Sequence, residues 1–141
     1  MVGRGWRLLV GLAVAGVLAG CGIVSAAAPV VPAQVAQYYH PRGVPVAVSA
    51  GQAVTISTGD FYFDPNTLTV AAPGTQVTLR IRNYTPMRHT FTLPAAGVNA
   101  VLHHGLTTTV RFAAPAAGTY YFYCSEPGHA QQGMVGKLVV R

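Results

Sequence analysis

The sequence predicts an all-β fold, and three observations lead to that prediction. Apolar Val77, Leu79 and Ile81 alternate with polar neighbours, which is the period of a strand with one buried and one solvent-facing side. Short runs of this kind recur between residues 50 and 141, where Gly, Pro, Asp and Asn form turn signals between several of them. No helical period competes with them. We therefore expect an antiparallel sandwich of seven or eight strands in residues 50–141.

The chain begins with the layout of a signal peptide. Arg4 and Arg7 precede an apolar run from Leu8 to Ala19, an arrangement typical of exported proteins. Residues 18–21, Leu-Ala-Gly-Cys, resemble the bacterial lipobox, which implies that residues 1–20 are removed and that Cys21 carries lipid. An uncleaved membrane helix is the alternative, but the run contains glycines and is short for a span of about 20 apolar residues. Either anchor places the domain outside the cytoplasm.

Residues 21–49 are rich in Pro and Ala and show no regular period. They predict a semi-extended tether between the lipidated Cys21 and the domain. The alternative is an extra strand at a sheet edge, because Val44 to Val48 alternates with small residues. His40 is expected to be a solvated residue of this tether.

The strands predicted for the domain follow in chain order. They are residues 53–57, 67–70, 77–82, 89–93, 107–112, 119–124 and 137–141, with turns at 59–60, 64–66, 73–74 and 115–118. Residues 50–141 suffice for one hydrophobic core and no more, so a single domain is expected.

A thiol, an imidazole and a thioether lie close together near the end of the chain, at Cys124, His129 and Met134. Cysteine sulfur and imidazole nitrogen accommodate both Cu(I) and Cu(II), and methionine sulfur makes a weak axial contact. His89, which opens the strand 89–93, is the expected second imidazole. The prediction is one copper ion bound by His89, Cys124, His129 and Met134.

Two further histidines, His103 and His104, are expected to be solvated loop residues and are the fallback ligands if His89 is not one. The chain has only two cysteines, so lipid on Cys21 and copper on Cys124 leave none for a disulfide.

Several segments resemble the cupredoxins, or blue copper proteins. Residues 115–124 and 133–140 resemble the last two strands of that family, and residues 61–83 resemble its amino-terminal half. The resemblance implies a Greek-key β-sandwich that binds one copper ion and carries electrons, and that is not an enzyme. Four residues separate Cys124 from His129 and four separate His129 from Met134, a spacing similar to that of rusticyanins and auracyanins.

The same loop argues against related chemistry. A binuclear copper centre needs a second cysteine where this chain has Gly128, and a multicopper oxidase or nitrite reductase has a histidine where this chain has Ser125. A cysteine nucleophile with a histidine base is disfavoured, because no recognisable oxyanion device accompanies Cys124.

The resemblance also implies groups around the copper ligands. The backbone N–H groups of Thr90 and Glu126 are expected to donate hydrogen bonds to the Cys124 sulfur. The ring edge of His129 is expected to reach the surface through a mostly apolar patch, where a redox partner makes contact.

Charge indicates less about function. The chain has a formal net charge of +6, which falls to +4 if residues 1–20 are removed. Arg80, Arg82, Arg88 and Arg111 could steer an acidic partner or rest near anionic lipids. The sequence has no cluster of basic residues of the kind that would indicate nucleic-acid binding.

The sequence thus predicts an extracytoplasmic, lipid-anchored, monomeric carrier of single electrons. Its partners would be redox proteins: a cytochrome, an oxidase or a photosynthetic complex. A copper-storage or copper-delivery lipoprotein is the alternative.

Overall fold

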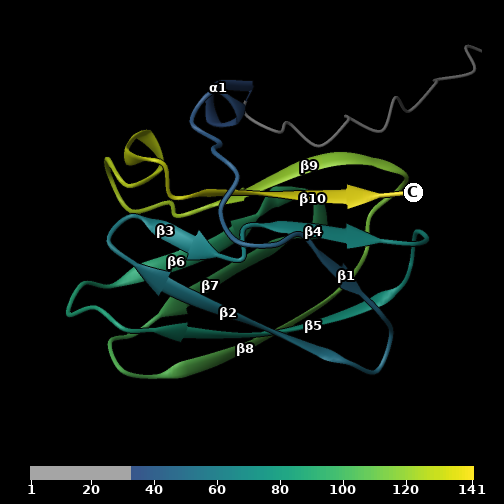
Figure 1. Ribbon diagram of the computed structural model, residues 1–141, viewed down its shortest axis with the longest axis horizontal. Helices are drawn as coiled ribbons and strands as arrows, with labels where there is room; N and C mark the ends of the chain where they lie inside the picture. The colour runs from purple at the N-terminus through teal and green to yellow at the C-terminus, as the bar shows by residue number, and fades with distance from the viewer. Residues whose placement is uncertain (1–32) are drawn as a thin grey trace, which may run out of the picture.

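Two β-sheets pack face to face in the computed structural model, which describes residues 33–141 (Figure 1). The six-stranded sheet has the order β1 (Val46–Val48), β4 (Thr67–Val70), β10 (Val135–Val140), β9 (Gly118–Tyr123), β6 (His89–Leu93) and β7 (Val98–Leu102). The four-stranded sheet has the order β3 (Tyr62–Asp64), β2 (Ala53–Gly59), β5 (Gln76–Asn83) and β8 (Thr107–Ala113). Three short helical segments are α1 (Ala33–Ala36), η1 (Pro94–Ala96) and η2 (Ala130–Gln132). The predicted all-β sandwich is confirmed.

Three of the strand pairs are parallel, which differs from the purely antiparallel sandwich that we expected. They are β1 with β4, β4 with β10, and β2 with β5. Parallel neighbours need a connection that returns to the same end of the sheet. Here the chain passes through β3 and β4 between β2 and β5, and β4 belongs to the other sheet. Crossing between sheets therefore produces the parallel pairs.

Ten strands are present among the described residues, because β1, β3 and β7 join the seven predicted runs. β3 has three residues, and β7 pairs with β6 at the edge of its sheet. β1 is the edge strand that the sequence allowed for Val44 to Val48, and it extends the sandwich to before residue 50.

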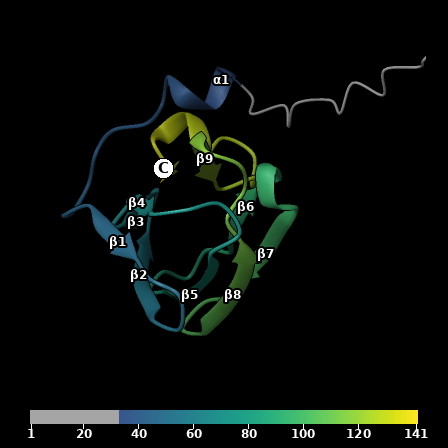
Figure 2. The ribbon, with the colours of Figure 1, turned by 90° about the vertical axis from the view of Figure 1, so that its right-hand side faces the viewer.

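The segment between α1 and β1 packs on the sandwich through its tyrosine and backbone groups. The Tyr39 hydroxyl bonds the Thr67 hydroxyl at 2.6 Å, and its ring meets the edge of Tyr121. The Asn66 side chain accepts from the Arg42 N–H at 2.7 Å and donates to the His40 carbonyl at 2.7 Å. The His40 side chain is exposed. Figure 2 shows α1 outside the sheets, near β9.

The expected signal peptide (1–20) and the lipidated Cys21 lie outside the described residues, as does the tether as far as residue 32. Within residues 33–141, no helix has the length and apolar character needed to cross a membrane.

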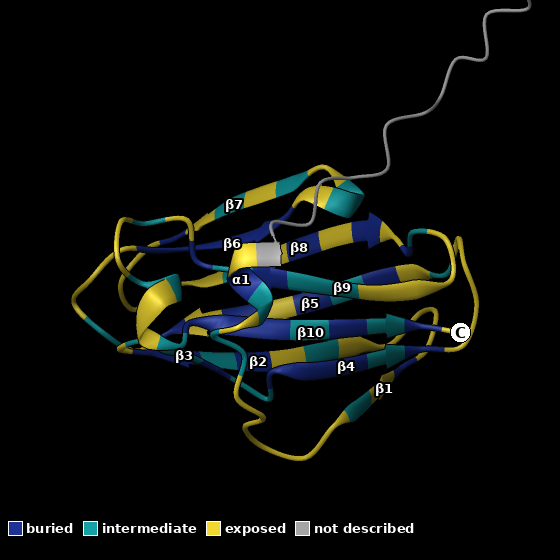
Figure 3. Cartoon of the chain, turned by 90° about the horizontal axis from the view of Figure 1, so that it is seen from above, coloured by how far each residue is buried: buried dark blue, intermediate teal, exposed yellow. Residues whose placement is uncertain are grey.

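Three phenylalanines form the centre of the core at the end where the predicted copper ligands lie. Phe63, Phe91 and Phe122 are fully buried, and their ring centroids lie 4.8 to 6.1 Å apart. Burial alternates along β5 from residue to residue, and Figure 3 shows buried and exposed residues following one another along the strands. Phe122 and Cys124 are both buried, as the period of two along β9 predicts.

Candidate metal centre

The four predicted copper ligands come from two parts of the chain that meet at one end of the sandwich. His89 is the first residue of β6, and Cys124 follows the last residue of β9. His129 lies in the loop after β9, and Met134 immediately precedes β10. In Figure 1 this loop lies at the left-hand end of the molecule, together with the start of β6.

Three donor atoms face one another at short distances. Nδ1 of His89 lies 3.1 Å from Nδ1 of His129. The Cys124 sulfur lies 3.3 Å from Nδ1 of His129 and 4.0 Å from Nδ1 of His89. Metal–nitrogen and metal–sulfur bonds of about 2.0 to 2.3 Å place three ligands of one ion roughly 3.5 Å apart. The spacing of these donors therefore fits a single metal ion.

His89 is held in the neutral form that a metal ligand requires. Its side chain is fully buried, and burial lowers its pKa below the ordinary value, an effect to which nearby His129 adds. Asp60 and Glu126 oppose this shift, but they are smaller influences. A neutral imidazole presents a lone pair, so this environment favours metal binding over protonation.

Cys124 is 1% exposed, and its sulfur is contacted by His89 and Thr90, the first two residues of β6. The Thr90 N–H donates to it at 3.3 Å, and the Thr90 hydroxyl lies 3.8 Å away. The hydroxyl also accepts from the Ser125 N–H at 2.7 Å. Thr90 therefore joins β6 to the loop that begins at Cys124.

The hydrogen bonds of Glu126 differ from the one expected. Among residues 33–141, its N–H makes no hydrogen bond to the Cys124 sulfur, and its carboxylate pairs with Arg88 at 2.8 Å. The Glu126 carbonyl accepts from the His129 N–H at 3.1 Å, which closes a turn between the two ligands. Glu126 thus shapes the loop, and Thr90 supplies both the N–H and the hydroxyl that lie near the sulfur.

Met134 is fully buried and is tied to two other predicted ligands through its backbone. Its N–H donates to the His129 carbonyl at 3.1 Å, and its carbonyl accepts from the Cys124 N–H at 3.1 Å. These bonds hold the loop without any contribution from a metal.

His129 is the half-buried member of the set. The Phe61 ring meets it edge to face, with centroids 4.8 Å apart. Pro127 and Gly128 beside it are exposed, and so are Pro86 and Met87 of the loop before β6.

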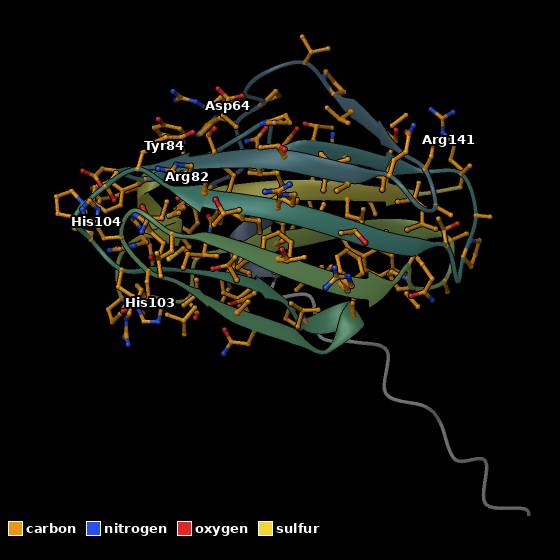
Figure 4. All side chains as sticks on the ribbon, turned by 90° about the horizontal axis from the view of Figure 1, so that it is seen from below. Asp64, Arg82, Tyr84, His103, His104 and Arg141 are labelled. Atoms are coloured by element: carbon orange, nitrogen blue, oxygen red, sulfur yellow. The ribbon has the colours of Figure 1, made fainter. Side chains whose placement is uncertain are left out.

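The fallback histidines do not join the group of metal-binding side chains found within residues 33–141. His103 and His104 are exposed in the loop between β7 and β8 (Figure 4). Nδ1 of His104 bonds the Thr85 carbonyl at 2.6 Å.

Sequence reasoning missed three residues that contact the two histidines. Phe61 covers His129, while the Thr85 hydroxyl and the Asp60 carboxylate face Nε2 of His89 at 2.9 and 3.7 Å. Thr85 lies four residues before His89, in the loop between β5 and β6. Asp60 and Phe61 lie in a segment remote in sequence from any ligand, so no local pattern connects them with the site.

A β-sandwich that brings one cysteine sulfur, two imidazoles and a buried thioether together at one end defines the class of mononuclear copper proteins. The family model described as "Cupredoxin-like domain" matches residues 24–140. The chain therefore belongs to the cupredoxin family, and its cofactor is one copper ion.

Solved structures of auracyanins resemble the whole domain. Auracyanin A, a "blue" copper protein of Chloroflexus aurantiacus, is 30% identical with a TM-score of 0.54, over 70% of this chain and 100% of that one. The dithionite-reduced auracyanin of Roseiflexus castenholzii is 25% identical with a TM-score of 0.56, over 66% of this chain and 99% of that one.

Rusticyanin from Acidithiobacillus ferrooxidans is similar over a short stretch. It is 63% identical over 27 residues, which are 19% of this chain. The match spans only 14% of the length of that rusticyanin.

Proposed function

We propose that this protein carries single electrons between redox proteins, with copper bound by His89, Cys124, His129 and Met134. The observation that carries the proposal is the mutual approach of Nδ1 of His89, Nδ1 of His129 and the Cys124 sulfur. When bound, copper supplies a one-electron couple between Cu(I) and Cu(II).

The roles proposed for the protein side chains follow from their burial. Cys124 and His89 are shielded from water at the edge of the phenylalanine cluster, which keeps solvent from the thiolate. Burial of both residues also favours a resident ion over an exchangeable one, because release would require the loops to open. Electron transfer is therefore favoured over copper storage or delivery.

The test is to add Cu(II) to the copper-free full-length chain. We expect an intense blue thiolate-to-copper band that disappears on reduction and returns on oxidation. Cys124→Ser should abolish the band, and His103→Ala, which changes an exposed histidine outside the site, should keep it.

A colourless product, or a band that survives Cys124→Ser, would refute the copper assignment. A blue protein that quickly yields Cu(I) to a competing chelator would favour storage or delivery.

We propose that partners dock at the exposed edge of His129. Pro127 and Gly128 precede it in its loop, and these two residues, together with Pro86 and Met87 of the loop before β6, are exposed and uncharged, which suits brief contact. Docking here would bring a partner's redox group near a copper ligand.

The charge of the surface supports a partner that is acidic. Arg80, Arg82 and Arg111 project from the outer side of β5 and β8, and none pairs with a carboxylate within residues 33–141. Figure 4 shows Arg82 beside Tyr84 near the end where His104 lies. An acidic rim on a cytochrome, an oxidase or a photosynthetic complex would complement them, and such steering should weaken with salt.

Export and lipid attachment remain part of the proposal. The support is the leader-like sequence of residues 1–20, the Leu-Ala-Gly-Cys pattern ending at Cys21, and the absence of a need for Cys21 as a copper ligand. Expression of the full chain with radiolabelled palmitate should label the wild type and leave Cys21→Ala unlabelled. A labelled Cys21→Ala variant, or an unlabelled wild type, would refute the lipidation site.

A further inference from the structure

We propose that Thr85 is a positioning residue that fixes the tautomer of His89, so that Nδ1 is the bare nitrogen facing the other copper ligands. The inference rests on the proposed role of His89 as a ligand and adds the group that prepares it. It follows from a chain of hydrogen bonds from Asn83 to Thr85 to His89.

The chain starts at the Asn83 side chain, at the end of β5. This amide is fully buried, and its nitrogen donates to the Met87 carbonyl at 2.7 Å and to the Leu102 carbonyl at 2.9 Å. Two carbonyl acceptors take both N–H protons, which identifies the other side-chain atom as the oxygen. Oδ1 of Asn83 is therefore an acceptor.

Thr85 donates twice to that oxygen. Its backbone N–H lies 3.0 Å from Oδ1 of Asn83, and its hydroxyl lies 3.1 Å away. The second acceptor near the hydroxyl, the Met87 carbonyl at 3.5 Å, also has no proton to give. A Thr85 hydroxyl proton directed at either of these oxygen atoms leaves only lone pairs to face His89.

Nε2 of His89 lies 2.9 Å from this hydroxyl oxygen and is the donor when the hydroxyl proton is directed at Oδ1 of Asn83. Its other polar neighbour, the Asp60 carboxylate at 3.7 Å, is likewise an acceptor. Both neighbours favour a proton on Nε2. Because a neutral imidazole carries only one such proton, Nδ1 keeps its lone pair and faces His129 and Cys124.

The position of Thr85 is itself restrained from a second side. Its carbonyl accepts from Nδ1 of His104 at 2.6 Å, which joins the loop before β6 to the loop between β7 and β8. This contact gives an exposed histidine a structural part in holding Thr85. Groups that fix the remote nitrogen of a metal-binding histidine typically change metal affinity 10- to 100-fold when removed.

The decisive variant is Thr85→Val, which keeps the shape of the side chain and removes the acceptor. In the copper-free full-length chain, the ¹⁵N shifts of the imidazole report the tautomer of His89 at a pH where it is neutral. We expect the wild type to hold the proton on Nε2, and Thr85→Val to lower the ratio of the two tautomers about tenfold. Cu(I) affinity, measured by chelator competition, should fall about 10-fold or more.

Two further variants separate the hydroxyl from a general loss of structure. Thr85→Ser keeps the acceptor and should restore both the tautomer and the affinity. Thr109→Val makes the same chemical change at an exposed position of β8 and should alter neither.

The proposal is overturned if wild-type His89 carries its proton on Nδ1, a measurement that needs no variant to fold. It is also overturned if Thr85→Val keeps the wild-type tautomer and an affinity within twofold, or if Thr85→Ser behaves like Thr85→Val. A wild-type protein that fails to turn blue would contradict the copper proposal instead, and the tautomer of the copper-free chain would still test Thr85.

Discussion

Gly136→Ala is expected to destabilise the sandwich, because the space that a side chain needs there is already filled. Gly136 lies opposite Phe122 in the pairing of β9 and β10, and a Cβ atom on Gly136 would overlap the Phe122 ring. That ring is fully buried, with Phe63 at 5.3 Å and Phe91 at 4.8 Å between centroids. It has no free space into which to retreat.

The magnitude follows from the cost of overpacking a core, which is typically about 1 to 3 kcal/mol. We expect a value near the upper end, about 2 to 3 kcal/mol, because the obstructing atoms belong to a ring held by two others. For a domain of this size, such a loss lowers Tm by roughly 10 °C. The measurement is urea and thermal unfolding of the copper-free protein, since bound metal would add its own stabilisation.

Gly59→Ala is the matched control. A Cβ atom there also overlaps an aromatic ring, that of Tyr62, but Tyr62 is only partly buried and can swing outward. The expected cost is below about 1 kcal/mol, mainly through disturbing the Arg42 contact over the Tyr62 ring.

A double-mutant cycle tests the cause directly. Phe122→Leu shortens the obstructing side chain, so the double variant should be less destabilised than the sum of the two single variants by about 1 kcal/mol or more. Wild-type stability in Gly136→Ala, or strict additivity with Phe122→Leu, would refute the overlap as the reason.

The remaining predictions concern the sulfur, the docking edge and the amino-terminal segment. Thr90→Val removes the hydroxyl 3.8 Å from the Cys124 sulfur and keeps the backbone N–H bond. Because the thiolate loses stabilisation, the reduction potential of the copper site should fall by roughly 20 to 60 mV. Cyclic voltammetry that gives an equal or higher potential would contradict this. Ala130→Glu places a charge beside His129 and should slow electron exchange with an acidic redox protein while the blue band persists. The control variant Ala113→Glu, at the exposed end of β8, should slow the exchange less. Equal exchange rates in both variants would refute docking at His129. Asn66→Ala leaves the Arg42 N–H and the carbonyls of His40 and Val135 without their buried partner. Unfolding by urea should show that the free energy of unfolding falls by about 2 to 3 kcal/mol. A fall of less than half this value would mean that water replaces the side chain.

The sequence allowed the sandwich and most of its strands to be predicted, because alternation is a local signal. The run from Val77 to Ile81 alternates so clearly that it forms the middle of β5, with these apolar side chains buried. The parallel pairing of β2 with β5 could not be predicted in this way. Strand order depends on where the chain crosses between sheets, and that is decided by packing over the whole domain.

In the candidate site, too, the residues that a local sequence pattern marks could be predicted and the others could not. Cys124, His129 and Met134 share one short loop, so their residue types and spacing were informative by themselves. His89 could be added because it opens a strand beside them. Thr85 and Asp60 contact the far side of the His89 ring. Threonine and aspartate are common in turns for other reasons, so only the three-dimensional arrangement identifies these two as neighbours of the ligand.

Hydrogen bonds between backbone groups hold the loop that carries three of the ligands. The Cys124 N–H bonds the Met134 carbonyl, the Met134 N–H bonds the His129 carbonyl, and the His129 N–H bonds the Glu126 carbonyl. Thr90 then joins this loop to β6 through the Ser125 N–H and the Cys124 sulfur.

Each of these bonds is made by the protein alone, so the two segments that carry the ligands are already joined before metal arrives. A frame of this kind should resist the different geometries that Cu(I) and Cu(II) prefer. A small change in structure on gaining or losing an electron is the property that the proposed electron carrier requires, and a protein that releases its copper has no need of it.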